Sequence, residues 1–293
     1  MTRHETSLSY AARIERVLGH IAEHLDDRLD LDDLAAIACF SPCHFHRIFV
    51  AMTGETVAEA VRRLRLHRAA VELNRSQRTM PRVAARAGYG SVAAFTRAFS
   101  CAFGTPPAAY RRLGQDLRPA PPQAGMKTMT HAPALRTAVR YDVTVEDFPE
   151  IELATLKHQG DYQRIGTCFD RLSSWAGACR LLGPDTRMIG IYYDDPAAKP
   201  LSELHSEAGL TLPEGTAIEP DMQWRSVGGY PVAKLVHKGP YADLDVAYAY
   251  LYHVWLPQSG RQPGEAPCFE EYLNNPRLLP PSEWLTAVHL PLA

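Results

Sequence analysis

The segment PCFEEYLNNP, residues 267–276, places two adjacent carboxylates, Glu270 and Glu271, between a phenylalanine and a tyrosine. A carboxylate in such a run could act as a general base, pair with a bound cation or simply face solvent. The run is typical of a β-strand, in which successive side chains point to opposite faces. Glu270 then shares a face with Cys268 and Tyr272, and Glu271 lies on the other. We expect Glu270 to face a ligand site and Glu271 to be exposed.

An internal repeat supports this assignment. The segment LATLKHQGDY at 153–162 matches VAKLVHKGPY at 232–241, and RMIGIYYDDP at 187–196 matches PCFEEYLNNP. The repeat predicts two α+β units, each of strand, strand, helix and strand, that share an antiparallel sheet about a pseudo-twofold axis with a cleft between them. The expected ligand-binding residues are Glu270, Tyr272, Tyr192, Gly190, Met188, Trp255 and Trp175. The two tryptophans are candidates for the core as well as for the pocket.

The alignment places Gly190 where the second unit has Glu270, so the predicted cleft holds one carboxylate between two tyrosines. Aromatic faces attract a cation and a single anion pairs with it, which favours an organic cation as the ligand. Two alternatives stay open. A buried glutamate with a raised pKa could serve as the general base of a hydrolase for reactive small molecules. The domain could also sequester such molecules or mediate protein contacts.

Histidines and cysteines give weaker signals for chemistry. His158 and His237 recur at strand ends before a glycine, which favours a structural role. The cluster CFSPCHFH at 39–46 lacks the ligand spacing of a zinc motif. We expect neither a metal nor a cofactor, and no catalytic residue. The six cysteines form no CxxC pair, which is typical of a reduced, cytoplasmic protein.

Charge is distributed unevenly along the 293 residues, a length typical of two domains. Residues 34–118 contain 13 arginines and four acidic residues, whereas residues 119–293 contain 14 basic and 21 acidic residues. A basic excess of this kind predicts affinity for nucleic acid phosphates. No apolar run approaches the roughly 20 residues that cross a bilayer, and the start lacks the pattern of a signal peptide. We therefore expect no membrane partner.

The basic half contains a second repeat. LAAIACFSPCHFHRIFVAMTG at 34–54 resembles VAARAGYGSVAAFTRAFSCAFG at 83–104. Each copy predicts a helix, a tight turn and a second helix, capped by Ser41 or Ser91. Residues 55–76 predict one long helix between the copies. Together these features predict an all-α domain with two helix-turn-helix units joined by a long helix.

Residues 10–113 resemble the DNA-binding domain of AraC/XylS-family transcriptional regulators, most closely in AARAGYGSVAAFTRAFSCAFGTPPAAYRR. The resemblance implies contacts with double-stranded promoter DNA from Cys43, His46, Arg47, Val92, Ala93, Thr96 and Arg97. Arg47 and Arg97 are the best candidates for base contacts because guanidinium can bridge guanine O6 and N7. The alternative for each arginine is a phosphate contact or a pair within the protein.

The second half resembles the gyrase-inhibitor-like (GyrI-like) effector-binding domain in LKHQGDY, LVHKGPY, YLYHVWLPQSG and CFEEYLNNPRLLPPSEWLTAVHLPL. This resemblance implies an interior pocket for small apolar or cationic molecules and assigns Glu270 to it. The expected organisation is a DNA-binding domain at 1–113, a proline-rich linker at 114–138 and an effector-binding domain at 139–293. The combination implies a ligand-responsive regulator with RNA polymerase as a partner, and not an enzyme.

Overall fold

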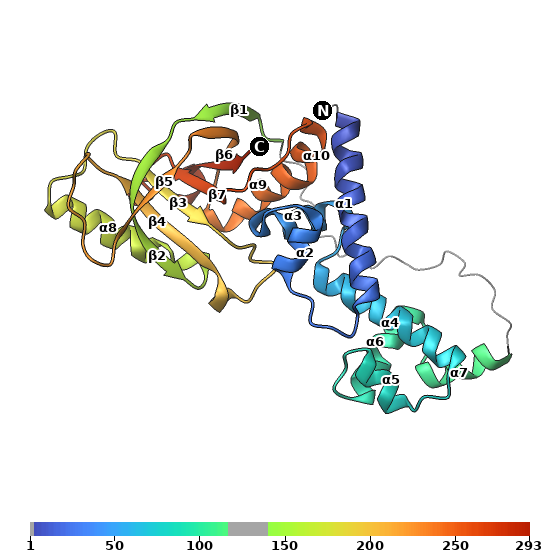
Figure 1. Ribbon diagram of the computed structural model, residues 1–293. Helices are drawn as coiled ribbons and strands as arrows, with labels where there is room; N and C mark the ends of the chain where they lie inside the picture. The colour runs from blue at the N-terminus through green and yellow to red at the C-terminus, as the bar shows by residue number, and fades with distance from the viewer. Residues whose placement is uncertain (1–2, 117–139) are drawn as a thin grey trace.

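The computed structural model describes residues 3–116 and 140–293, which form a helical N-terminal part and an α+β C-terminal part (Figure 1). The N-terminal helices are α1 (Arg3–Glu23), α2 (Leu31–Ala38), α3 (Pro42–Thr53), α4 (Val57–Arg75), α5 (Met80–Arg86), α6 (Val92–Phe103) and α7 (Pro107–Asp116). The predicted linker at 114–138 begins within α7, and its residues 117–138 lie outside the described residues. No single helix in the described ranges is long and apolar enough to cross a membrane; α2 and α3 reach that length only together, across a 75° bend.

The short helices of the N-terminal part lie where the repeat predicts them. α2 and α3 form the first pair, and α5 and α6 the second. Pro42 opens α3, where its missing N–H leaves no helical hydrogen bond unmade. Ser91 caps α6 by accepting a hydrogen bond of 3.2 Å from the backbone N–H of Ala94. The long helix α4 separates the two pairs and contributes Leu66 and Leu73 to an apolar cluster that also contains Phe95 and Phe99 of α6.

The turn after α2 contains a non-glycine residue in the left-handed region. Cys39 has φ 54°, and Gly88 occupies the corresponding place after α5 with φ 84°. A residue with a Cβ atom loses roughly 1–2 kcal/mol in this conformation, and part of that is recovered through the lower chain entropy of the unfolded state. We therefore expect Cys39→Gly to raise the free energy of unfolding by up to about 1 kcal/mol, measured by urea denaturation.

Cys179 provides the matched control for this substitution. It also ends a helix, but its φ of −83° carries no left-handed strain. Cys179→Gly should therefore lower stability through the added flexibility of the unfolded chain. Equal effects of the two substitutions would contradict the assignment of strain to Cys39.

The C-terminal part is built on one antiparallel sheet. Its strands are β1 (Val143–Phe148), β2 (Ile151–Gln159), β3 (Met188–Tyr192), β4 (His205–Thr211), β5 (Gln223–Val227), β6 (Tyr230–Lys238), β7 (Cys268–Tyr272) and β8 (Leu285–Pro291). They pair in the order β1-β6-β8-β7-β3-β4-β2-β5. The strands β3 and β7 therefore meet at the centre, and Gly190 is the cross-strand partner of Glu270.

Helices cover one face of this sheet. The helix α8 (Gly166–Ala178) packs on β2 and β4, and α9 (Leu244–Ala249) continues into the π-helical segment η4 (Tyr250–Trp255) and α10 (Leu256–Ser259). Short 3₁₀ turns complete the part: η1 (Tyr162–Arg164), η2 (Leu201–Glu203), η3 (Tyr241–Asp243) and η5 (Pro281–Glu283). The opposite face of the sheet carries a separate apolar cluster with Ile189, Ile191 and Phe269. Because side chains alternate along β3 and β7, residues 190 and 270 face the helices instead.

The two parts of the molecule share one hydrophobic core. Buried residues of α1, α2 and α3 form a continuous cluster with Leu251, Tyr252 and Leu256 from η4 and α10. Figure 1 shows α1 and α3 beside α9 and α10, with α5 to α7 pointing away from the sheet. The hydroxyl of Tyr10 in α1 also donates a hydrogen bond of 2.9 Å to the carbonyl of Arg261. The first helix pair is thus docked on the C-terminal part and the second pair is not.

Candidate functional site

A cavity of about 1540 Å³ lies between α8, α9 and the centre of the sheet, and residues of α3 and η4 contribute to its wall. Its described lining includes eight tyrosines: Tyr141, Tyr162, Tyr192, Tyr241, Tyr248, Tyr250, Tyr252 and Tyr272. Six carboxylates and three guanidinium groups complete its charged lining. The volume exceeds the usual range of small-molecule sites, about 300–1,000 Å³. The surplus of anions and of aromatic faces suits a cationic organic ligand.

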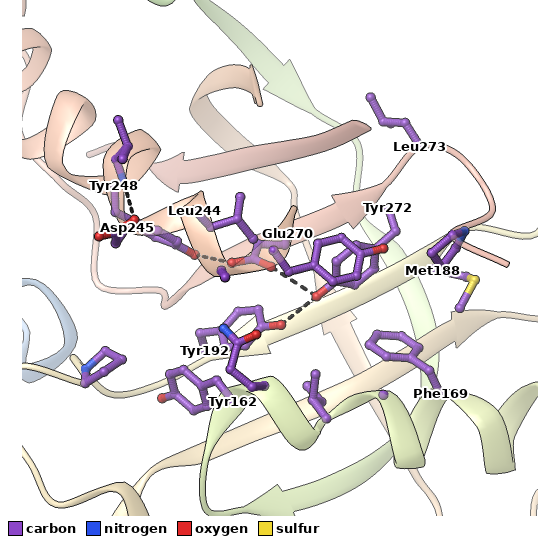
Figure 2. A pocket seen from close by; sticks show the side chains of 18 of the residues that line it. Tyr162, Phe169, Met188, Tyr192, Leu244, Asp245, Tyr248, Glu270, Tyr272 and Leu273 are labelled. Atoms are coloured by element: carbon purple, nitrogen blue, oxygen red, sulfur yellow. Dashed lines mark hydrogen bonds between the residues drawn. The ribbon is translucent and has the colours of Figure 1, made fainter. Parts of the chain in front are cut away.

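Glu270 is the buried acid of this cavity, with only 4% of its surface exposed. The hydroxyl of Tyr248 donates to Oε1 and that of Tyr272 to Oε2, each at 3.0 Å. Tyr192 lies 2.6 Å from the Tyr272 hydroxyl and extends the network (Figure 2). Burial raises the pKa of Glu270 to about 7, although the tyrosine hydroxyls favour the charged form. The carboxyl group therefore titrates near neutral pH.

Glu270 and Tyr272 lie on the same face of β7, as strand alternation predicts. Both side chains point into the cavity from β7, and Tyr192 and Met188 reach it from β3 (Figure 2). Gly190 does not line the cavity, because the ring of Tyr192 fills the space beside its Cα atom. A Cβ atom there would lie 2.9 Å from the ring of Tyr192, so glycine lets that ring fold back over its own strand. The glycine positions a tyrosine and does not leave room for a ligand.

The prediction that Glu271 is exposed was wrong. Its side chain is 14% exposed and pairs with Arg187 through two hydrogen bonds of 2.6 and 2.7 Å. The guanidinium of Arg187 also stacks over the ring of Phe148, on the face of the sheet away from the cavity. Burial alone would raise the pKa of Glu271, but the bonds from Arg187 hold it below the usual range. Glu271 is thus a structural partner with no access to the cavity.

The two tryptophans proposed for the pocket lie outside its lining. Trp175 packs on the apolar cluster between α8 and the sheet, whereas Phe169 of the same helix faces the cavity. Trp255 packs on the core that α1 shares with α10. Both are partly buried core residues, which is the alternative that their helical positions also allowed.

Tyr248 is the main site residue missing from the expected ligand-binding set, because its helical position favours the core. It follows Leu244 by one helical turn, a spacing equally typical of a core position. Its contribution depends on a hydrogen bond to Glu270, 22 residues away, and on a contact with α3 from the N-terminal part. No local pattern encodes either contact. The abundance of tyrosines between residues 241 and 252 is the one signal in the sequence.

The first predicted recognition helix faces the C-terminal part. His44 is fully buried: the Tyr252 hydroxyl donates to Nδ1 at 2.6 Å, and Nε2 donates to the carbonyl of Ala266 at 3.0 Å. Burial and the nearby charge of Arg47 lower the pKa of His44 to about 3, so the ring is neutral. Cys43, with its thiol 3.9 Å from the same carbonyl, also points into this contact.

His46 and Arg47 reach the same surface and share one acid. His46 donates through Nδ1 to Oδ2 of Asp195 at 2.8 Å, and Nε of Arg47 lies 4.0 Å from the same oxygen. Burial alone would raise the pKa of Asp195, but the bond from His46 and the charge of Arg47 lower it to about 2. The three residues predicted to contact bases from α3 are therefore in contact with the C-terminal part in this structure.

The second predicted recognition helix, α6, presents its candidate residues to solvent. Ala93 and Arg97 are exposed, and Val92 and Thr96 are half-buried. The same helix buries Phe95 and Phe99 in the apolar cluster that it shares with α4 and α5, so its opposite face is turned to solvent. The four residues lie on the first two turns of α6, and their contacts with bases stay a prediction.

The histidines of the C-terminal repeat have structural partners. His158 donates to the carbonyl of Asp161 at 3.0 Å, and Nδ1 of His237 lies 2.8 Å from the hydroxyl of Tyr141. Among residues 3–116 and 140–293 there is no group of three or more His, Cys, Asp or Glu side chains that could hold a metal ion. The six cysteines are free thiols.

Comparison with known proteins identifies a different family in each part of the chain. Residues 141–293 match the family described as a GyrI-like small molecule binding domain, and residues 34–113 match a helix-turn-helix domain. The right origin-binding protein of Escherichia coli K12 is 29% identical over 167 residues, which cover 53% of this chain and 56% of that protein. The chain thus spans a little over half the length of that relative.

Two other relatives each match one part of the chain. The regulatory protein SoxS of Salmonella typhimurium is 34% identical over 104 residues, which cover 36% of this chain and 97% of SoxS. The DNA gyrase inhibitor of Edwardsiella piscicida is 29% identical over 156 residues, which cover 51% of this chain and 97% of that protein.

Proposed function

The chain belongs to the AraC-type helix-turn-helix regulators that carry a GyrI-like small-molecule-binding domain, and on this premise we propose that it regulates transcription in response to an organic cation. Two helix-turn-helix units bind promoter DNA, and the two pseudo-symmetric halves of the C-terminal sheet enclose the effector. RNA polymerase is the protein partner of the DNA-bound form.

The proposal depends most on the burial of Glu270 in the wall of the cavity. One carboxylate, buried at the centre of the sheet and held by Tyr248 and Tyr272, faces a cavity lined with tyrosines. A cation that enters gains both the anion and the aromatic faces, whereas a neutral analogue gains only the apolar contacts. The buried charge thus selects for positively charged ligands.

The basic N-terminal part supports the DNA-binding half of the proposal. Residues 34–118 hold 13 arginines against four acidic residues, and α6 leaves Arg97 exposed. Arginines on the surface neutralise phosphates and release counterions, which makes binding depend steeply on salt. We expect the affinity of the full chain for the promoter region of its own gene to fall by at least about tenfold between 50 and 200 mM salt.

A matched pair of ligands tests the effector half. Benzamidine is a planar cation at pH 8, and benzamide has nearly the same shape without the charge. Benzamidine should raise the melting temperature of the full chain and change transcription from its promoter in vitro, and benzamide should do neither. Equal shifts with both compounds would contradict a cation site, and turnover of an electrophilic ester would favour a hydrolase instead.

A further inference from the structure

The guanidinium of Arg47 already lies at the aromatic wall of the cavity. Its Cζ atom is 4.2 Å from the centre of the Tyr248 ring and 5.4 Å from that of Tyr252. The side chain is 12% exposed, and its nearest anion is Asp195, which also lines the cavity. The ring of Tyr248 that Arg47 covers is the one whose hydroxyl holds Glu270.

This arrangement resembles a bound ligand more than an ordinary surface ion pair. A planar, delocalised cation stacks on a tyrosine face, with one carboxylate at its edge and a second reached through the tyrosine hydroxyl. The cation comes from the N-terminal part, whereas its two aromatic contacts and Asp195 belong to the C-terminal part. An external planar cation on Tyr248 would meet the same groups and would have to displace Arg47.

We propose that Arg47 is an internal ligand of the effector site, so that the site selects planar organic cations and binds them in exchange for the Arg47 side chain. This inference rests on the proposed cation-binding function and adds the shape of the effector and the step that transmits its binding. The class of ligand is an amidinium, a guanidinium or an aromatic cation that can stack where the guanidinium stacks.

Displacement of Arg47 would act on DNA binding because of where it lies in α3. In helix-turn-helix proteins the N-terminal residues of the second helix contact base edges in the major groove. In α3 these residues are Cys43, His46 and Arg47, and all three contact the C-terminal part. The docked helix cannot present them to DNA. The exchange therefore couples the cavity to the first recognition helix, and by linkage DNA that binds α3 must raise the affinity for the cation.

Asp195 is the acid that both His46 and Arg47 of α3 approach. It accepts a hydrogen bond from His46 at 2.8 Å and lies beside Arg47, so both side chains hold α3 on the cavity wall. When α3 leaves with Arg47 and His46, Asp195 loses both partners and becomes a second anion for the incoming cation. The cavity is thus prepared for an exchange of one cation for another without a change in its net charge.

The decisive measurement is the affinity of the full chain for benzamidine, by calorimetry at pH 8, with and without Arg47→Gln. Removing the internal competitor should tighten binding by about tenfold, which corresponds to a wild-type cavity that is free of Arg47 about a tenth of the time. Arg75→Gln removes an exposed arginine of α4 by the same substitution and should leave the affinity unchanged. Benzamide provides the uncharged control for each variant.

The outcomes separate this inference from the proposed function. If no variant binds benzamidine, the cation site itself is wrong. If the wild type binds benzamidine and Arg47→Gln binds it equally or more weakly, Arg47 is a structural residue and the exchange is wrong.

A second measurement needs no substitution and applies even if Arg47→Gln fails to fold. Hydrogen exchange of the α3 amides in the wild-type chain should speed up with saturating benzamidine and not with benzamide. Unchanged exchange in α3, together with measurable benzamidine binding, would also overturn the exchange mechanism.

Discussion

Replacing Glu270 by glutamine is expected to weaken benzamidine binding by about 10- to 150-fold at pH 8, which corresponds to the loss of one charged hydrogen bond of about 1.5–3 kcal/mol. Glutamine keeps the volume of the side chain and can still bond to Tyr248 and Tyr272. The change therefore removes the negative charge and little else. Calorimetry with benzamidine and benzamide measures the effect, and benzamide should bind both proteins equally.

The same carboxyl group should make cation binding depend on pH. The pKa of Glu270 is about 7 in the folded protein, so the acid is neutral below that pH and charged above it. Benzamidine affinity in the wild type should fall by up to about tenfold per pH unit as the pH decreases from 7 to 5. The Glu270→Gln variant should show a flat profile over this range.

Stability should change in the opposite sense to binding. The folded-state pKa of Glu270 lies above its ordinary value of 4.5. The contribution of this group to the free energy of unfolding is therefore fully present below pH 4.5 and is lost as the pH rises through 7. The cost of the buried charge at pH 8 is on the order of 3 kcal/mol. Glu270→Gln should therefore gain stability relative to the wild type between pH 5 and pH 8. The negative charge of Glu270 thus destabilises the fold at pH 8.

The adjacent residue Glu271 provides the control for the substitution of Glu270. Its pKa is lowered by Arg187, so its charge stabilises the fold above its ordinary pKa, and that contribution is lost as the pH falls. Glu271→Gln should therefore lower the melting temperature at pH 8 and leave benzamidine affinity unchanged. If both substitutions had the same effect on binding, the division of the two acids between cavity and structure would be wrong.

The sequence predicted the local part of this site well. Strand alternation and the repeat placed Glu270, Tyr272 and Tyr192 together, because a period of two leaves only one arrangement of each strand. The helix pairs of the N-terminal part followed from caps such as Ser91 and from apolar spacing. These features depend on residues close together in the chain.

The rest of the site depends on contacts that no local pattern encodes. The strand β4 lies between β2 and β3, yet its Glu207 and Gly209 are unfavourable in a strand, so no strand was predicted at residues 205–211. Glu207 is buried there because Arg225 and Thr155, from two other strands, hydrogen-bond to it. In the same way the sequence predicted that Arg47 contacts DNA, because its aromatic partners Tyr248 and Tyr252 are distant in the chain and are brought to it only by the fold.

The largest expected effect on DNA binding comes from Arg97. It lies on the exposed face of α6, one turn after Ala93, and its side chain is free of the C-terminal part in the described structure. A guanidinium that bridges guanine O6 and N7 contributes about 1–3 kcal/mol to discrimination between bases. Arg97→Ala should therefore weaken binding to the promoter site by about 5- to 150-fold, measured by a mobility-shift titration at fixed salt.

The way in which this loss is distributed decides what Arg97 contacts. If it reads a base, affinity for the specific site should fall while affinity for a shuffled duplex changes little, and the salt dependence should stay the same. A uniform loss on both duplexes with a shallower salt dependence would assign Arg97 to a phosphate. Because α6 is exposed whether or not α3 is docked, the effect of Arg97→Ala should not depend on benzamidine. The effect of a substitution in α3 on DNA affinity should depend on benzamidine. This difference would distinguish α6, which is exposed in both states, from α3, which the cation releases.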